Sequence, residues 1–216
     1  PATNGIGAEA AWALTGGTGT GVRIIDVEYS WNQSHEDLDK VLGMALLLGP
    51  GDSNTDPFSD NNHGTAVLGE IIATRDSLGV TGLSYGADIS LAPADTALLD
   101  YNPANAIALA VANSAAGDVI LIEQQTVVCG LTSDANCLNC GPLEWIASVS
   151  TAIQNATAAG RIVVEAAGNG GTDLDQAACG TTFDRTVFDS GAIIVGAGGS
   201  PASGFDRERW DYSCYG

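Results

Sequence analysis

The sequence predicts an α/β domain with a doubly wound, mostly parallel sheet and helices on both faces, incomplete at its C-terminal end. Five short apolar runs, rich in β-branched residues, alternate with helical patterns. The runs are continuously apolar rather than alternating, which is typical of strands buried on both faces. The length of 216 residues, with 45% hydrophobic residues, suits one domain with a sizeable core.

The expected strands are residues 22–28, 87–94, 118–125, 161–167 and 192–196, and the expected helices are residues 63–73, 103–115 and 142–158. The last two helices begin with proline near the first turn, where its missing N–H group costs nothing. Polar residues collect in loops 49–62, 129–141 and 170–182. Sites in such sheets form at the carboxyl ends of the strands.

Composition excludes several classes of protein. The chain has 7 Lys and Arg residues against 26 Asp and Glu residues, a net charge of −19. Such a surface repels phosphate and anionic lipid, which argues against a nucleic-acid or membrane partner. With 15% charged and 45% hydrophobic residues, the chain is not expected to be disordered. The apolar run 41–48 is far shorter than the ~20 residues that span a bilayer.

The cysteines indicate an oxidising, extracellular setting, because the chain holds five of them and few lysines. An odd number means that one thiol is free or has its partner outside these residues. Cys137 and Cys140 form a CxxC pair without a second pair nearby, so disulfides are favoured over a four-ligand zinc site.

The glycine run 16–21 looks like a phosphate loop but comes before a strand instead of opening a helix. Glycines 196–199 do follow a strand, but no helical pattern comes next. A phosphate loop needs a helix N-terminus against the phosphates. Dinucleotide binding is therefore disfavoured.

Three polar residues stand where strands end or a helix begins. Asp26 lies near the end of an apolar strand, where a carboxylate is costly unless paired. His63 opens a helix and precedes Gly64, which lets another backbone approach closely, whereas His35 is expected to be a solvated surface residue. Asn169, flanked by glycines, is either part of a turn or an amide that stabilises an oxyanion.

Four segments together resemble one family. They are Gly-Thr-Gly-Val-Arg-Ile-Ile-Asp at 19–26, Ser-His-Glu-Asp-Leu at 34–38, Asn-His-Gly-Thr-Ala-Val-Leu-Gly at 62–69 and Ala-Ala-Gly-Asn at 166–169. Their order and spacing resemble the subtilisin-like serine peptidases (subtilases) over essentially the whole chain. The resemblance implies that Asp26 orients His63, that His63 deprotonates a serine, and that Asn169 donates to the oxyanion during peptide hydrolysis.

The family's Gly-Thr-Ser-Met-Ala nucleophile segment does not occur here. Residues 210–216 resemble a stretch that precedes it, so we expect residues 1–216 to be the N-terminal two-thirds of a single peptidase domain. This chain alone is expected to be inactive, and a C-terminal remainder that carries the serine is an expected partner.

Other departures concern substrate recognition. Asp26-Val27-Glu28 places a second carboxylate two residues from the first, and Glu-Gln-Gln-Thr at 123–126 replaces the family's Ser-Leu-Gly-Gly. Glu123, Gln124 and Gln125, with Ala166, Ala167 and Gly168, are the predicted substrate-binding residues. One hypothesis is an acidic cleft, walled by Glu123 and Glu165, that favours Lys or Arg side chains. The alternatives are that the glutamates point into solvent, or that Glu123 bonds a catalytic group.

Structural calcium is also expected from the resemblance. Residues 74–80 resemble the family's calcium loop, which makes Asp76 and Asp37 the candidate metal ligands. The acidic segment 52–56 has the oxygen spacing of a cation site but lacks the Gly and Glu of an EF-hand.

The sequence therefore predicts a secreted serine endopeptidase that acts on protein or peptide substrates. The alternatives are a non-catalytic subtilase-like binding module and, with less support, a calcium-dependent structural domain. A downstream Gly-Thr-Ser segment would favour the enzyme.

Overall fold

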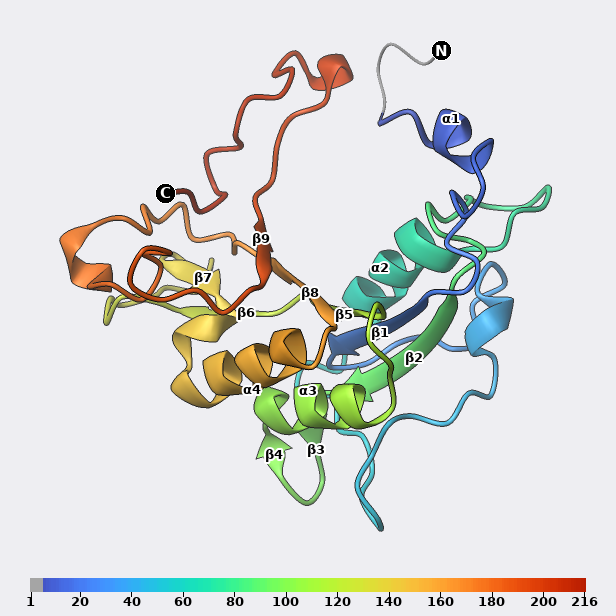
Figure 1. Cartoon of the computed structure of the whole chain (residues 1–216), viewed down its shortest axis with the longest axis horizontal. Coiled ribbons are helices and arrows are strands. Elements are labelled where there is room, and N and C mark those ends of the chain that lie inside the picture. Colours follow the sequence, from blue (N-terminus) through green and yellow to red (C-terminus); the bar gives the residue numbers. More distant parts are fainter. Residues whose placement is uncertain (1–5) are drawn as a thin grey trace.

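The computed structural model describes residues 6–216 and contains a five-stranded parallel sheet (Figure 1). The sheet order is β2-β1-β5-β8-β9, with β1 (Arg23–Glu28), β2 (Asp88–Pro93), β5 (Val119–Ile122), β8 (Ile162–Ala166) and β9 (Ile193–Val195). Each of the five predicted runs contains one of these strands. The chain extends the sheet from β1 to β2 and then returns to add β5 on the other side, which makes the β1–β5 boundary the topological switch point.

Helices cover both faces of the sheet, as predicted. Helices α3 (Pro103–Ala112) and α4 (Ala147–Ala158) lie on one face, over a core that includes Ile25, Val27 and Ile120 (Figure 1). Helix α2 (Asn62–Ile72) packs on the other face, where its Leu68 and Ile72 join Ile24 and Leu91. Because side chains alternate along a strand, Asp26 and Glu28 share the α2 side with Ile24.

The smaller elements differ from the sequence expectation. Helix α4 starts at Ala147 instead of 142, because Pro142 ends strand β7 (Cys140–Pro142), and α3 ends at Ala112. Strand β6 (Gln125–Val127) pairs with β7, β3 (Asp95–Thr96) pairs with β4 (Asp100–Tyr101), and α1 (Ala8–Trp12) was not expected. Strands of two or three residues carry no usable periodicity. Short 3₁₀ turns lie at Asp39–Val41, Leu143–Trp145, Ala177–Cys179 and Pro201–Ser203.

Two disulfides cross-link segments that lie outside the five-stranded sheet. Cys129 is bonded to Cys179, and Cys137 to Cys140, while Cys214 is a buried free thiol. Cys137 and Cys140 of the CxxC pair therefore form a disulfide, which is the alternative that the sequence favoured over a zinc site. Within residues 6–216, every helix falls short of the length and apolarity needed to cross a bilayer.

Candidate active site

The site begins at the carboxyl end of β1 with two buried carboxyl groups on one face. Asp26 is completely buried, and its Oδ2 accepts a hydrogen bond of 2.8 Å from the Trp31 indole N–H. Its Oδ1 is buried without a hydrogen-bond partner among residues 6–216. Burial raises the pKa of Asp26 to about 8, against the Trp31 hydrogen bond, which lowers it; the charge of Glu28 adds to the rise. This carboxyl group is therefore mainly protonated at neutral pH.

His63 lies in the first turn of α2 and contacts the second of these carboxyl groups. Its Nδ1 is 2.6 Å from Glu28 Oε2, and Glu28 Oε1 accepts the backbone N–H of Tyr29 at 2.7 Å. The Glu28 side chain is 5% exposed and that of His63 is 63% exposed. The hydrogen bond from Glu28 raises the pKa of His63, because it stabilises the imidazolium.

Gly64 makes this contact sterically possible. A Cβ atom at this position would lie 2.4 Å from the Ser30 carbonyl oxygen and 2.9 Å from Glu28 Cγ. The expectation that Gly64 permits a close approach is confirmed: the start of α2 rests directly on the end of β1.

The geometry differs from the expectation at one point, since His63 is hydrogen-bonded to Glu28 and not to Asp26. The physical reason lies in the strand. The Trp31 indole N–H is already hydrogen-bonded to the Asp26 carboxyl group. Glu28 lies two residues nearer the strand end on the same face, and its side chain is one methylene longer. The Asp-Val-Glu spacing already placed Glu28 on this face, but nothing in the sequence singled out Trp31.

Asn169 follows strand β8 (Ile162–Ala166). Gly168, with φ of +90°, makes the turn between the strand and Asn169. Asn169 is exposed, and its backbone N–H donates to Gln125 Oε1 at 2.7 Å. Its side-chain amide makes no hydrogen bond with residues 6–216. Neighbouring strands are ~4.8 Å apart, so the ends of β1 and β8, separated by β5, lie ~10 Å from each other.

The three predicted substrate residues after β5 lie in three different surroundings in the structure. Glu123 is half-buried and follows Ile122, which pairs with Val27, so Glu123 lies beside the Glu28 end of β1. Burial raises the pKa of Glu123 while the charge of His63 lowers it. Gln125 joins Asn169, as described. Gln124 is buried, and its Oε1 accepts a hydrogen bond of 3.2 Å from the Tyr101 hydroxyl, so it is part of the core.

Glu165 does not wall the cleft, in contrast to the acidic-cleft hypothesis. It is fully buried on the α4 side of β8, where its Oε2 accepts the Glu144 backbone N–H at 3.3 Å. Burial raises the pKa of Glu165, and the neighbouring Glu144 raises it further. Because β8 side chains alternate, the neighbouring Val164 and Ala166 face the other side of the sheet.

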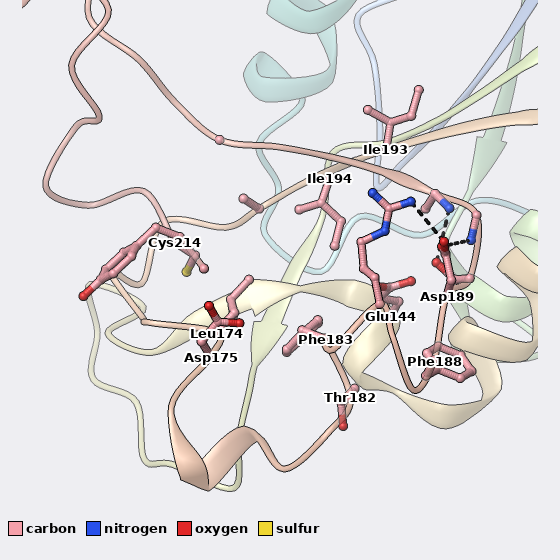
Figure 2. Close-up of a pocket in the computed structure, with 18 residues that line it drawn as sticks. Glu144, Leu174, Asp175, Thr182, Phe183, Phe188, Asp189, Ile193, Ile194 and Cys214 are labelled. Carbon is pink, nitrogen blue, oxygen red and sulfur yellow. Dashed lines mark hydrogen bonds and ion pairs between the residues drawn. The ribbon is translucent and has the colours of Figure 1, made fainter.

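A separate hollow of about 460 Å³ lies along β9, with Glu144, Phe183, Ile194 and Cys214 in its lining (Figure 2). Ala167, which is buried, is the one predicted substrate residue among its lining residues. Asp26, Glu28, His63 and Asn169 are not among its lining residues, so the hollow is separate from the His63 site.

The two predicted metal ligands belong to no larger cluster of metal-binding side chains among residues 6–216. Asp37 is buried, with Oδ2 accepting the Val80 N–H at 2.8 Å and Oδ1 without a partner in the described part of the chain. Asp76 is exposed and accepts the Leu78 N–H at 2.7 Å. No group of three or more His, Cys, Asp or Glu side chains among residues 6–216 could hold a metal ion.

Comparison with known proteins gives a consistent result. The Subtilase family model, Peptidase_S8, matches residues 17–205. Alkaline elastase YaB from Bacillus sp. (strain YaB) is 32% identical over 163 residues, which is 72% of this chain and 36% of that protein. This chain thus matches only about a third of the length of this relative.

Solved structures share the fold. The psychrophilic subtilisin-like protease Apa1 from Pseudoalteromonas sp. AS-11 superposes with a TM-score of 0.60 at 21% identity, covering 95% of this chain and 42% of that one. A protease from Pseudoalteromonas arctica PAMC 21717 also gives 0.60, at 20% identity, covering 99% of this chain and 65% of its own.

Proposed function

The chain belongs to the subtilase family of serine peptidases, and from this premise we propose that it supplies the base and the oxyanion donor of a serine endopeptidase. One observation carries the proposal: the His63 Nδ1 atom is held by a buried carboxylate while Nε2 makes no hydrogen bond with residues 6–216. Such an imidazole is fixed in one tautomer with its second nitrogen available as a base.

In this proposal, His63 Nε2 takes the proton of a serine hydroxyl as the serine oxygen attacks the substrate carbonyl carbon. The Glu28 carboxylate, which is hydrogen-bonded to Nδ1, stabilises the imidazolium that forms, and Asp26 lies two residues before it on the same face of β1. The Asn169 side-chain amide donates a hydrogen bond to the oxyanion. His63 then gives the proton to the leaving amine, and water hydrolyses the acyl-enzyme. We propose that the serine lies outside residues 1–216.

The proposed substrates are proteins or peptides in an extracellular setting. Glu123 is the acidic side chain on the His63 side, and it favours a basic substrate side chain nearby. The Gln125 side chain accepts a hydrogen bond from the Asn169 backbone N–H and so lies between the ends of β5 and β8. Ala166, Ala167 and Gly168 form the β8 side of the proposed substrate site, and the backbone N–H of Ala167 is already bonded to the Val195 carbonyl oxygen.

Structural calcium finds only partial support in the residues present. Asp37 Oδ1 is a buried oxygen without a partner in the described residues, which a cation could satisfy. Ca²⁺ takes six to eight oxygen ligands, however, and among residues 6–216 Asp37 and Asp76 do not gather a third acidic side chain. The side chains of residues 6–216 therefore do not make a calcium site by themselves, and no step of the mechanism uses one.

The test is fluorophosphonate labelling of the gene product that contains this chain, together with hydrolysis of fluorogenic peptides. We expect labelling that His63→Ala removes, and no labelling of residues 1–216 alone. A complete, folded gene product that neither reacts with fluorophosphonate nor cleaves peptides would exclude the enzyme. Peptide binding without cleavage would favour the non-catalytic binding module.

A further inference from the structure

We propose that Glu28, and not Asp26, is the positioning carboxylate of His63, and that Asp26 is a neutral support held by Trp31 behind it. This inference rests on the proposed function and assigns the roles of the two acidic residues within it.

The two oxygens of Glu28 both have defined partners. Oε2 contacts His63 Nδ1 at 2.6 Å, and Oε1 accepts the Tyr29 N–H at 2.7 Å, which fixes the rotation of the carboxylate. A short contact to Nδ1 keeps the imidazole proton on that atom in the neutral state. The Glu28 side chain is almost completely buried, so water does not compete for this hydrogen bond.

Asp26 has a different set of contacts. Its Oδ2 accepts from the Trp31 indole at 2.8 Å, and its Oδ1 is enclosed without a partner among residues 6–216. An ionised carboxylate with one hydrogen bond and no exposed surface is strongly disfavoured, whereas a neutral carboxyl group is tolerated. The raised pKa of Asp26 agrees with this assignment.

Charges around His63 favour a single ionised acid on β1. The acidic groups that act on the imidazole are Glu28 and Asp26 from β1 and Glu123 after β5, and Glu70 of α2 acts in turn on Glu123. Two ionised carboxylates on one buried strand face would repel each other. Proton retention by Asp26 leaves Glu28 to carry the charge that stabilises the imidazolium.

The first experiment is NMR of the imidazole nitrogens in the 216-residue chain, titrated against pH. The chain has two histidines, so His35 is an internal reference. We expect neutral His63 to be protonated on Nδ1 in the unsubstituted chain. Glu28→Gln should lower the pKa of His63 and mix its tautomers, whereas Asp26→Asn should leave both nearly unchanged.

Glu70→Gln is the matched control, because it removes one carboxylate, as Glu28→Gln does, but from an exposed position on helix α2, which also carries His63. If Glu28→Gln fails to fold, Glu28→Asp tests the contact by shortening the side chain. The inference is overturned if His63 is protonated on Nε2 in the unsubstituted chain, or if Asp26→Asn shifts His63 as much as the Glu28 variant does.

The second experiment separates this inference from the proposed function. In the gene product that contains this chain, Glu28→Gln should lower kcat/KM by about 10⁴-fold, the size of effect known for loss of the charge of the acid in a triad. The acidic limb of the pH profile should move to lower pH, which a merely structural role would not produce. An unchanged acidic limb contradicts the inference; a gene product without activity contradicts the proposed function, while the NMR result still decides the role of Glu28.

Discussion

Replacement of Asp26 by asparagine is expected to stabilise the fold at neutral pH. The pKa of Asp26 rises from 3.8 to about 8 on folding, so between these values the folded state binds more protons than the unfolded state. Stability contributed by this group is complete below pH 3.8 and is lost as the pH rises toward 8.

The magnitude follows from the linkage relation. Each pH unit inside the window costs about 1.4 kcal/mol, so ionisable Asp26 lowers the free energy of unfolding by on the order of 4 kcal/mol at pH 7. Asparagine cannot ionise, and its side-chain oxygen can still accept the Trp31 hydrogen bond. We therefore expect Asp26→Asn to match the unsubstituted chain near pH 4 and to exceed it by up to about 4 kcal/mol at pH 7.

The assay is urea unfolding of both chains at pH 4, 5, 6, 7 and 8, with Glu70→Gln, which removes an exposed carboxylate, as a control. Subtraction of the two curves removes the contribution of distant buried acids such as Glu165, because distant sites are additive, and leaves Asp26 together with its coupling to Glu28. Equal pH slopes, or a larger deficit of Asp26→Asn at pH 7 than at pH 4, would refute the assignment of Asp26 as a neutral buried acid.

Three further predictions concern the surrounding structure. Gly64→Ala should destabilise the fold by about 1–3 kcal/mol, since its Cβ would meet Ser30 and Glu28, and urea unfolding together with the His63 NMR signal measures both effects; an unchanged His63 signal would contradict the role of Gly64. Glu165→Gln should reduce the loss of unfolding free energy as the pH rises above 4.5, the ordinary pKa of Glu165, because burial and Glu144 favour the protonated form of this residue. Urea unfolding at several pH values measures the change, and an unaltered pH dependence would indicate that Glu165 is solvated. Cys129→Ser with Cys179→Ser opens a loop with a sequence separation of 50, which should cost about 4 kcal/mol of unfolding free energy, and a melting temperature equal to that of the unsubstituted chain would argue against this disulfide.

The sequence by itself determined the fold class and the strand ends that carry polar groups. Continuous apolar runs such as residues 161–167 predict buried parallel strands, because burial on both faces leaves no polar alternation. The helix start at His63 and the glycines around Asn169 were equally readable, since capping and turns depend on nearby residues. Hairpin β6–β7 was not, because its pairing depends on contacts between segments distant in sequence.

Tertiary structure alone decided which carboxyl group meets His63. The spacing of Asp26 and Glu28 placed both on one face of β1, but it could not say that the Trp31 indole would occupy the first. Nor could it show that Glu165 turns into the core beneath α4 beside Glu144, away from His63. Periodicity fixes the face of a strand on which a side chain lies, whereas its partner and its charge depend on burial and on neighbours that only the packed structure brings together.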